Sequence, residues 1–128
     1  MIQVSESLKA ELMTGAEFVL VQWLLMNGDA DAAAYLPQLE LAKVSSCCAC
    51  GCASINFSIC GERSENAGMK ILSDFRWQDD RGNLFGAFVF ACDSLLAGLE
   101  VWSIDGEAAP TILPSISLLV PFIKSPAV

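Results

Sequence analysis

The stretch that decides the fold is KILSDFRWQDDRGNLFGAFVFA (70–91). Residues 70–78 alternate between apolar and polar side chains, as a strand with two different faces does. The next five residues, DDRGN (79–83), have the Asp, Gly and Asn composition of a hairpin turn. An apolar run, LFGAFVFA (84–91), follows the turn. Together these features predict two antiparallel strands joined by a short turn.

The same pattern extends in both directions from this hairpin. Residues 53–60 alternate in the manner of a strand, CDSLLAG (92–98) is predicted to reverse the chain, and LEVWSI (99–104) is predicted to be the next strand. The last part of the chain, TILPSISLLVPFIKSPAV (111–128), contains several prolines and is apolar enough to pack back onto the sheet. The sequence therefore predicts an antiparallel meander of about four strands.

The part of the chain that precedes these strands reads as helical. Residues 5–27 fit one helix or two, with Gly15 as the point of division. Residues 31–42 fit a further helix, in which Pro37 must occupy a kink or the first turn of a new helical segment. We therefore predict a single α+β domain over residues 1–128, with N-terminal helices packed on the antiparallel sheet.

Composition narrows the classes of partner and the compartment. Only 17% of the residues are charged, against about 25% in a typical domain. The net charge of −8 argues against nucleic-acid binding and against attraction to anionic membranes. The longest apolar run, residues 18–26, is too short to span a bilayer, and the N-terminus has no pattern of a signal peptide. We therefore expect a cytoplasmic protein with reduced cysteines.

The predicted sheet carries apolar side chains on both faces of residues 84–91. Helices cover one face, so the second face needs another cover, since monomers rarely expose a large apolar patch. That cover is either the C-terminal segment 112–123 or a second copy of the chain in a homodimer. The aromatic residues predicted to form a binding surface, for the second copy or another protein, are Phe75, Trp77, Phe85 and Trp102.

Five of the six cysteines lie in SCCACGCASINFSIC (46–60), and the chain contains no histidine. Thiolate ligation of zinc or copper by Cys47, Cys48, Cys50 and Cys52 is one interpretation. Alternate residues of a flat strand lie about 6.5–7 Å apart, however, so chelation requires a bend, for example at Gly51. A redox pair at Cys47 and Cys50 is a second interpretation. The interpretation that we favour is that the cysteines are small side chains packed in the protein interior. We therefore expect no cofactor, and zinc is the alternative.

Carboxylates are the remaining candidates for chemistry. Asp74, Asp93 and Glu100 could come together as an acid–base or divalent-cation site. We favour a turn position for Asp93 and a solvent-exposed strand position for Glu100. The absence of histidine excludes Ser–His and Cys–His catalysis.

Three segments carry a resemblance, namely VSSCCACGCASI (44–55), FACDSLLAGLEVWSID (90–105) and ILPSISLL (112–119). In this order they resemble a group of small bacterial proteins with a C-G-C-x-S strand motif and no assigned activity. The resemblance covers about residues 30–119 and implies a bacterial cytosolic source. The chain departs from the pattern in its doubled Cys47–Cys48 and in Ser94, where the pattern has glycine.

These observations rank three functions. A protein-interaction or binding module that acts as a homodimer comes first. A thiolate-rich metal-binding protein is the alternative. An enzyme that uses carboxylates in a small-molecule pocket comes third.

Overall fold

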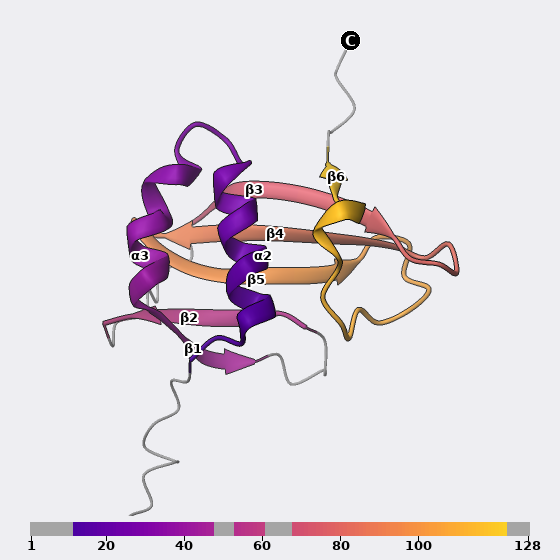
Figure 1. Ribbon diagram of the computed structural model, residues 1–128, viewed down its shortest axis with the longest axis horizontal. Helices are drawn as coiled ribbons and strands as arrows, with labels where there is room; N and C mark the ends of the chain where they lie inside the picture. The colour runs from indigo at the N-terminus through magenta and orange to yellow at the C-terminus, as the bar shows by residue number, and fades with distance from the viewer. Residues whose placement is uncertain (1–11, 48–52, 61–67, 123–128) are drawn as a thin grey trace, which may run out of the picture.

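A computed structural model describes residues 12–47, 53–60 and 68–122 of the chain. It shows an α+β fold in which helices pack on an antiparallel sheet of six strands in the order β1-β2-β5-β4-β3-β6 (Figure 1). The predicted fold class is therefore confirmed, while the number of strands is six rather than about four.

Helix α2 spans Gly15–Met26 and begins at a capping box. The Thr14 hydroxyl accepts a hydrogen bond from the Glu17 backbone N–H at 3.1 Å, and the Glu17 carboxylate accepts one from the Thr14 backbone N–H at 2.9 Å. These bonds satisfy two of the N–H groups that a helix start leaves without partners. Gly15 is therefore the first residue of a helix. Four residues of α2 are buried against the sheet, namely Leu20, Val21, Leu24 and Leu25.

The second predicted helix is divided in two. A 3₁₀ turn, η1, spans Ala32–Tyr35, and helix α3 spans Leu36–Leu41 with Pro37 in its first turn. That position suits proline, because the N–H that it lacks would have no helical partner there. Strand β1, Ala42–Cys47, begins immediately after α3. Its first residue, Ala42, is the last residue of the predicted helix.

The predicted central hairpin is confirmed. Strands β3, Met69–Gln78, and β4, Leu84–Cys92, pair antiparallel along their whole length. The Asp79 carboxylate holds the turn between them, because it accepts hydrogen bonds from the backbone N–H groups of Arg81 and Asn83, both at 2.9 Å.

Strand β5, Leu95–Ser103, is longer than predicted because the chain reverses in only two residues. Asp93 and Ser94 form this turn with φ values of 52° and 66°. Positive φ at both central residues matches the right-handed twist of the flanking strands and permits the tightest hairpin. Residues 95–98, predicted to belong to the reversal, are therefore part of β5.

The remaining strands lie toward the two edges of the sheet. Strand β2, Ile55–Ile59, pairs with β1 on one side and with β5 on the other. Strand β6, Val120–Pro121, pairs with β3 at the opposite edge.

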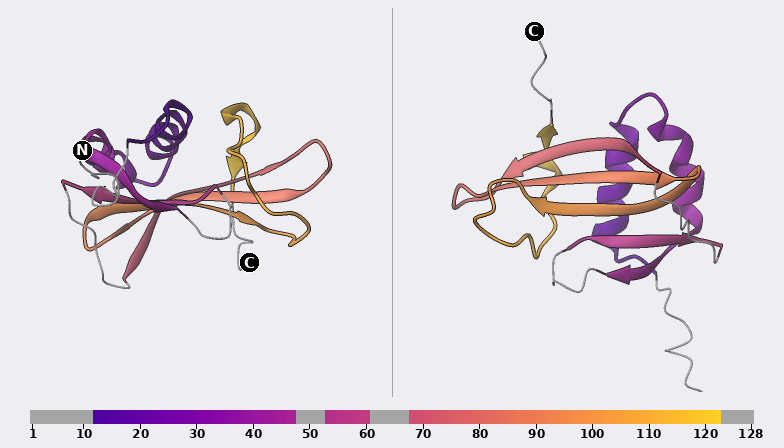
Figure 2. Two further views of the ribbon diagram at one scale, coloured as in Figure 1. Left: turned by 90° about the horizontal axis from the view of Figure 1, so that it is seen from below. Right: turned by 180° about the vertical axis from the view of Figure 1, so that it is seen from behind.

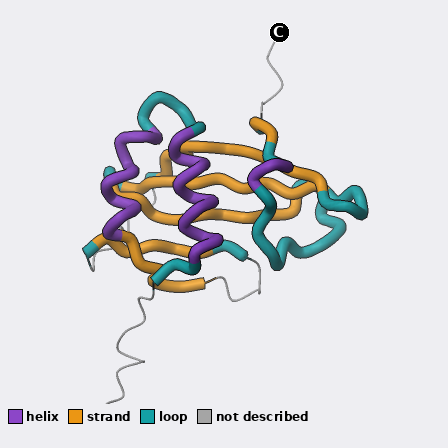
Figure 3. Tube along the Cα trace, viewed as in Figure 1, coloured by secondary structure: helices purple, strands orange, loops and turns teal. Residues whose placement is uncertain are grey.

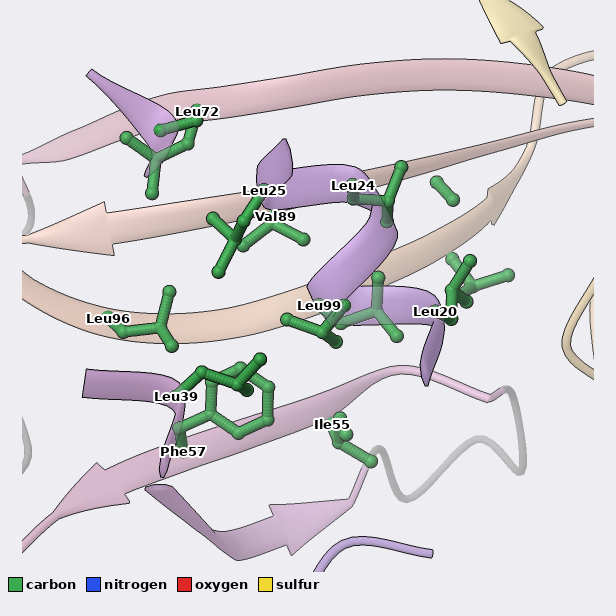
Figure 4. Close-up of a cluster of buried hydrophobic side chains, with 14 of the residues drawn as sticks. Leu20, Leu24, Leu25, Leu39, Ile55, Phe57, Leu72, Val89, Leu96 and Leu99 are labelled. Atoms are coloured by element: carbon green, nitrogen blue, oxygen red, sulfur yellow. The ribbon is translucent and has the colours of Figure 1, made fainter. Parts of the chain in front are cut away.

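One face of the sheet is covered by two separate structures. The helices lie over one end, and residues 104–119, called here the C-terminal segment, lie over the other end on the same side (Figures 2 and 3). The short 3₁₀ helix η2, Ile116–Leu118, belongs to this segment, and Leu119 is buried beneath it. The core lies between these covers and the sheet, as the leucines around Val89 and Leu99 show (Figure 4). The C-terminal segment therefore covers the helix side and not the second face.

Candidate functional site

The second face of the sheet, called here the open face, carries no described helix or loop (Figure 2). Its composition follows from strand alternation, because Phe85, Ala87 and Val89 of β4 point into the core. Phe88 and Phe90 therefore point the other way and are only half-buried. On β5 the same alternation places Trp102 on the open face, since Leu99 and Val101 are buried in the core.

Two glycines allow the aromatic rings to lie flat on this face. Gly86 is paired with Trp102, and Gly98 is paired with Phe90. A Cβ at Gly98 would stand 2.8 Å from Cζ of Phe90, and a Cβ at Gly86 would stand 2.8 Å from Cε2 of Trp102. Each ring thus occupies the space that a side chain on the neighbouring strand would fill.

Each of these rings contacts a second aromatic ring on the same face. The ring centroids of Phe88 and Phe90 are 5.9 Å apart. Trp102 stacks on Phe122, which follows β6, with a centroid distance of 6.1 Å. The open face therefore presents an aromatic platform made of two ring pairs, Phe88 with Phe90 and Trp102 with Phe122.

A β-bulge adds an aliphatic residue to the platform. The pairing of β3 with β4 shifts between Ile71 and Ser73, so that Leu72 is the extra residue and is buried in the core. Ile71 is paired with Phe90 and is 42% exposed. Uninterrupted alternation along residues 70–78 would place Ile71 on the same face as Phe75, and the bulge moves it to the open face.

Charged side chains surround the aromatic platform. Phe88 is flanked by Glu100 on β5 and by Asp74 on β3, and Arg76 is paired with Gly86. Burial raises the pKa of the Glu100 carboxyl above its ordinary value, and the nearby Ser54 hydroxyl opposes part of this rise. Glu100 is therefore a partly desolvated carboxylate in an aromatic surrounding, rather than the solvated strand residue that we expected.

Three of the four predicted binding-surface residues lie in the core. Phe75, Trp77 and Phe85 are each at most 7% exposed. The Phe75 ring meets Trp23 of α2 edge-on at 4.9 Å, and the Trp77 ring meets Phe85 at 5.1 Å. These three side chains face the helices and the C-terminal segment, so that only Trp102 of the predicted set lies on the open face.

Sequence reasoning did not assign Phe88, Phe90 and Ile71 to the site. The alternation of residues 84–91 already separated Phe88 and Phe90 from Phe85. The missing information was the register, which aligns Phe88 with Glu100 and Gly86 with Trp102 and so shows which residues share a face.

The described residues also line two cavities. One, of about 250 Å³, lies at the edge of β3 beside Asn27, Asp29 and Pro121. The Asp29 carboxylate there accepts a hydrogen bond from the Asp31 backbone N–H, and the Ser73 hydroxyl is buried. Asp74, one of the predicted carboxylates, also lines this cavity, together with the apolar residues Ile71, Leu72 and Phe75.

The second cavity, of about 340 Å³, is a groove between α2 and the C-terminal segment. Its lining is apolar, namely Gly15, Ala16, Val19, Leu20, Pro114 and Ile116. The described residues that line this groove include no titratable side chain, whereas the first cavity is lined by the carboxylates of Asp29 and Asp74 and by Ser73.

The predicted metal ligands fall largely outside the described residues. Cys48, Cys50 and Cys52 belong to the part of the chain that the structure does not describe, and Cys47 is the last residue of β1. Among residues 12–47, 53–60 and 68–122 no group of three or more cysteine or carboxylate side chains could hold a metal ion. The thiolate site therefore stays a prediction.

The predicted carboxylate cluster is not assembled in the described structure. Asp74 on β3 and Glu100 on β5 are both paired with Phe88 of β4. Because β4 lies between them, they are two strand spacings apart, or about 9.6 Å. Asp93 occupies the turn between β4 and β5, as expected.

No family model, curated protein or solved structure matches this chain. Within the described residues, none of the helices has the length and apolar character needed to cross a membrane.

Proposed function

We propose that this protein is an interaction module that forms a homodimer through its open face. The observation that carries the proposal is the half-buried aromatic platform of Phe88, Phe90 and Trp102, on a sheet face over which no described helix lies. Aromatic residues at the centre and polar residues at the rim are the typical anatomy of a protein interface. Here Asn56, Arg76 and Glu100 supply the polar rim.

A second copy of the chain suits this face better than an unrelated acidic protein would. The chain carries a net charge of −8, so two copies repel each other at long range. The open face nevertheless carries both signs, because Arg76 lies on the same face as Asp74 and Glu100. Two copies can therefore meet with opposite charges in contact and with their aromatic platforms packed about 10 Å apart, as stacked sheets do.

A cytosolic location belongs to the same proposal. Cys60 and Cys92 carry free thiols, as the reducing cytosol would leave them.

The test is sedimentation velocity together with native mass spectrometry of the purified chain. We expect a dimer that the double variant Ile71→Thr with Phe88→Thr weakens at least about tenfold, because central apolar contacts dominate interface energies. The matched control is Val19→Gln with Met26→Gln, which alters exposed apolar residues of α2 on the other side of the sheet and should leave the dimer intact.

Two results would contradict the proposal. One is a wild-type chain that remains monomeric at concentrations of hundreds of micromolar. The other is a dimer that the control variant weakens as much as the open-face variant. The same native spectrum compares the subunit mass with that of the bare chain, and it thereby tests the thiolate-metal alternative directly.

A further inference from the structure

The open face carries two charged side chains of opposite sign on the two strands that flank β4. Arg76 lies on β3, where it is paired with Gly86, and its side chain is exposed. Glu100 lies on β5, where it is paired with Phe88, and its side chain is half-buried. Because Phe75, Trp77, Leu99 and Val101 all point into the core, Arg76 and Glu100 both belong to the open face.

These two side chains do not neutralise each other within one chain. They are separated by β4, and neither of them forms an ion pair with another described residue. The ion pair found between described residues joins Lys70 to Asp31 on the helix side. The described structure therefore leaves one cation and one anion of the open face available to a partner.

Closing the open face against another molecule would remove more water from Glu100. Burial already raises the pKa of this carboxyl. Among the described residues, Ser54, Asn56 and Phe88 are its neighbours on the adjacent elements, and the charged side chains beyond β4 are Asp74 and Arg76. A buried carboxylate without a cation destabilises an interface, so the partner must bring a positive charge to this point.

A second copy brings that charge if it is related by a two-fold axis. In such an interface residue i contacts residue j of the partner, and residue j contacts residue i, so that one complementary pair is formed twice. The guanidinium group also suits the site, because it pairs with carboxylates through two parallel hydrogen bonds and packs well against aromatic rings.

Resting on the homodimer proposed above, we infer that Arg76 of each copy forms an ion pair with Glu100 of the other copy. These two symmetric pairs flank the packed aromatic rings and fix the register of one sheet on the other.

The test is a charge exchange between two variants, measured by sedimentation equilibrium. Arg76→Glu leaves two acids to face each other, and Glu100→Arg leaves two bases, so each variant alone should weaken its dimer on the order of 100-fold. In an equimolar mixture Glu and Arg meet in both pairs, and we expect a heterodimer within about tenfold of the wild-type affinity.

Matched controls separate this pairing from a general effect of net charge. Arg81→Glu and Glu107→Arg change the charge by the same amounts in the β3–β4 turn and in the C-terminal segment. We expect both control variants to dimerise like the wild type. The double variant Arg76→Glu with Glu100→Arg restores opposite charges within one chain type and should again form a homodimer.

The possible failures are distinguishable. If the wild type dimerises but neither the mixture nor the double variant recovers affinity, the ion pair is refuted while the homodimer through the open face stands. If the wild type does not dimerise, both proposals fall. Far-UV circular dichroism of each variant shows whether a loss of affinity accompanies an intact fold.

Discussion

The Trp102 indole lies across Gly86, its paired residue on β4, and occupies the space in which a side chain at position 86 would stand. The indole nitrogen is buried there and has no hydrogen-bond partner among the described residues. The flatness of the open face thus depends on a residue that contributes no atoms of its own beyond the backbone.

We expect Gly86→Ala to destabilise the fold by about 1–3 kcal/mol, because the added methyl group forces the indole away from its present position. The measurement is urea denaturation followed by tryptophan fluorescence. Gly15→Ala is the matched control, since a Cβ at that position meets nothing within 4 Å. In a helix this substitution should be neutral or stabilising by up to about 1 kcal/mol. Equal effects of the two substitutions would contradict the close approach of Trp102 to Gly86.

Ser94 has a φ of 66°, a conformation that suits glycine better than serine. We expect Ser94→Gly to stabilise the chain by roughly 0.5–1 kcal/mol, because the turn no longer carries this backbone strain. The side-chain amide of Gln38 donates a hydrogen bond to the Ser94 backbone carbonyl at 2.9 Å. The variant keeps this bond, because it involves only the backbone of residue 94. Ser115→Gly is the comparison, because Ser115 has a φ of −75° and gains nothing from glycine. A midpoint of chemical denaturation that falls for Ser94→Gly would refute this account of the turn.

Acid should weaken the two loops that carboxylates hold together. Hydrogen bonds to the Asn83 amide and to nearby backbone N–H groups lower the pKa of Asp79, and backbone hydrogen bonds from Glu107 and Leu84 lower the pKa of Asp105. A lowered folded-state pKa means that this stabilisation is complete above the unfolded value of about 3.9 and is lost as the pH falls below it. We expect Asp79→Asn to reduce stability at neutral pH and to flatten the loss in acid, measured as denaturation midpoints across pH.

Asp80→Asn is the control for that measurement. It removes the same charge from the adjacent position and leaves the carboxylate bonds of Asp79 in place. If Asp80→Asn changed the loss of stability in acid as much as Asp79→Asn does, the net charge of the chain, and not the turn, would govern the response.

Glu100 should have opposite effects on the single chain and on the dimer. Because burial raises its pKa, the folded chain binds the proton more readily than the unfolded chain does. The contribution of Glu100 to the stability of the folded chain is therefore fully present below the unfolded value of about 4.3, and it is lost as the pH rises through the folded-state pKa. We expect Glu100→Gln to stabilise the monomer at neutral pH and to weaken dimerisation, because Arg76 of the other copy loses its partner.

Urea denaturation at dilute concentration measures the first effect, and sedimentation equilibrium measures the second. Glu107→Gln serves as the control for both, since Glu107 is exposed and lies in the C-terminal segment. If Glu100→Gln strengthened the dimer, desolvation of the carboxylate would outweigh any ion pair, and the pairing with Arg76 would be wrong.

The sequence predicted which helices and strands form better than it predicted where each of them begins and ends. Alternation and the DDRGN turn identified the central hairpin because both signals are local. The sequence also contains the signal for the start of α2, since Thr14 followed by Glu17 is a capping box. Strand β6 could not be predicted, because two residues carry no periodic pattern and their pairing with β3 is a long-range contact.

The composition of the candidate site was harder to predict than the fold, for a physical reason. The bulge at Leu72 reverses the face of every residue that precedes it on β3, and no local signal announces it. Trp77 and Trp102 look equally suitable in the sequence. Only the register and the position of the C-terminal segment bury Trp77 and leave Trp102 on the open face.

The short pairing between β2 and β5 determines which part of the sheet unfolds first. Along this join Ile55 is paired with Leu99, and Asn56 with Gly98, while the Ser54 hydroxyl exchanges hydrogen bonds with the Val101 backbone. The neighbouring pair β3 and β4, by contrast, is matched from Met69 to Gln78. The sheet thus consists of a four-strand unit, β5-β4-β3-β6, and the β1–β2 pair, and the two parts meet where β2 pairs with β5. Amide hydrogen exchange should reveal β1 and β2 as one cooperative unit that detaches before the rest unfolds, and each detachment would briefly expose the strand edge of β5.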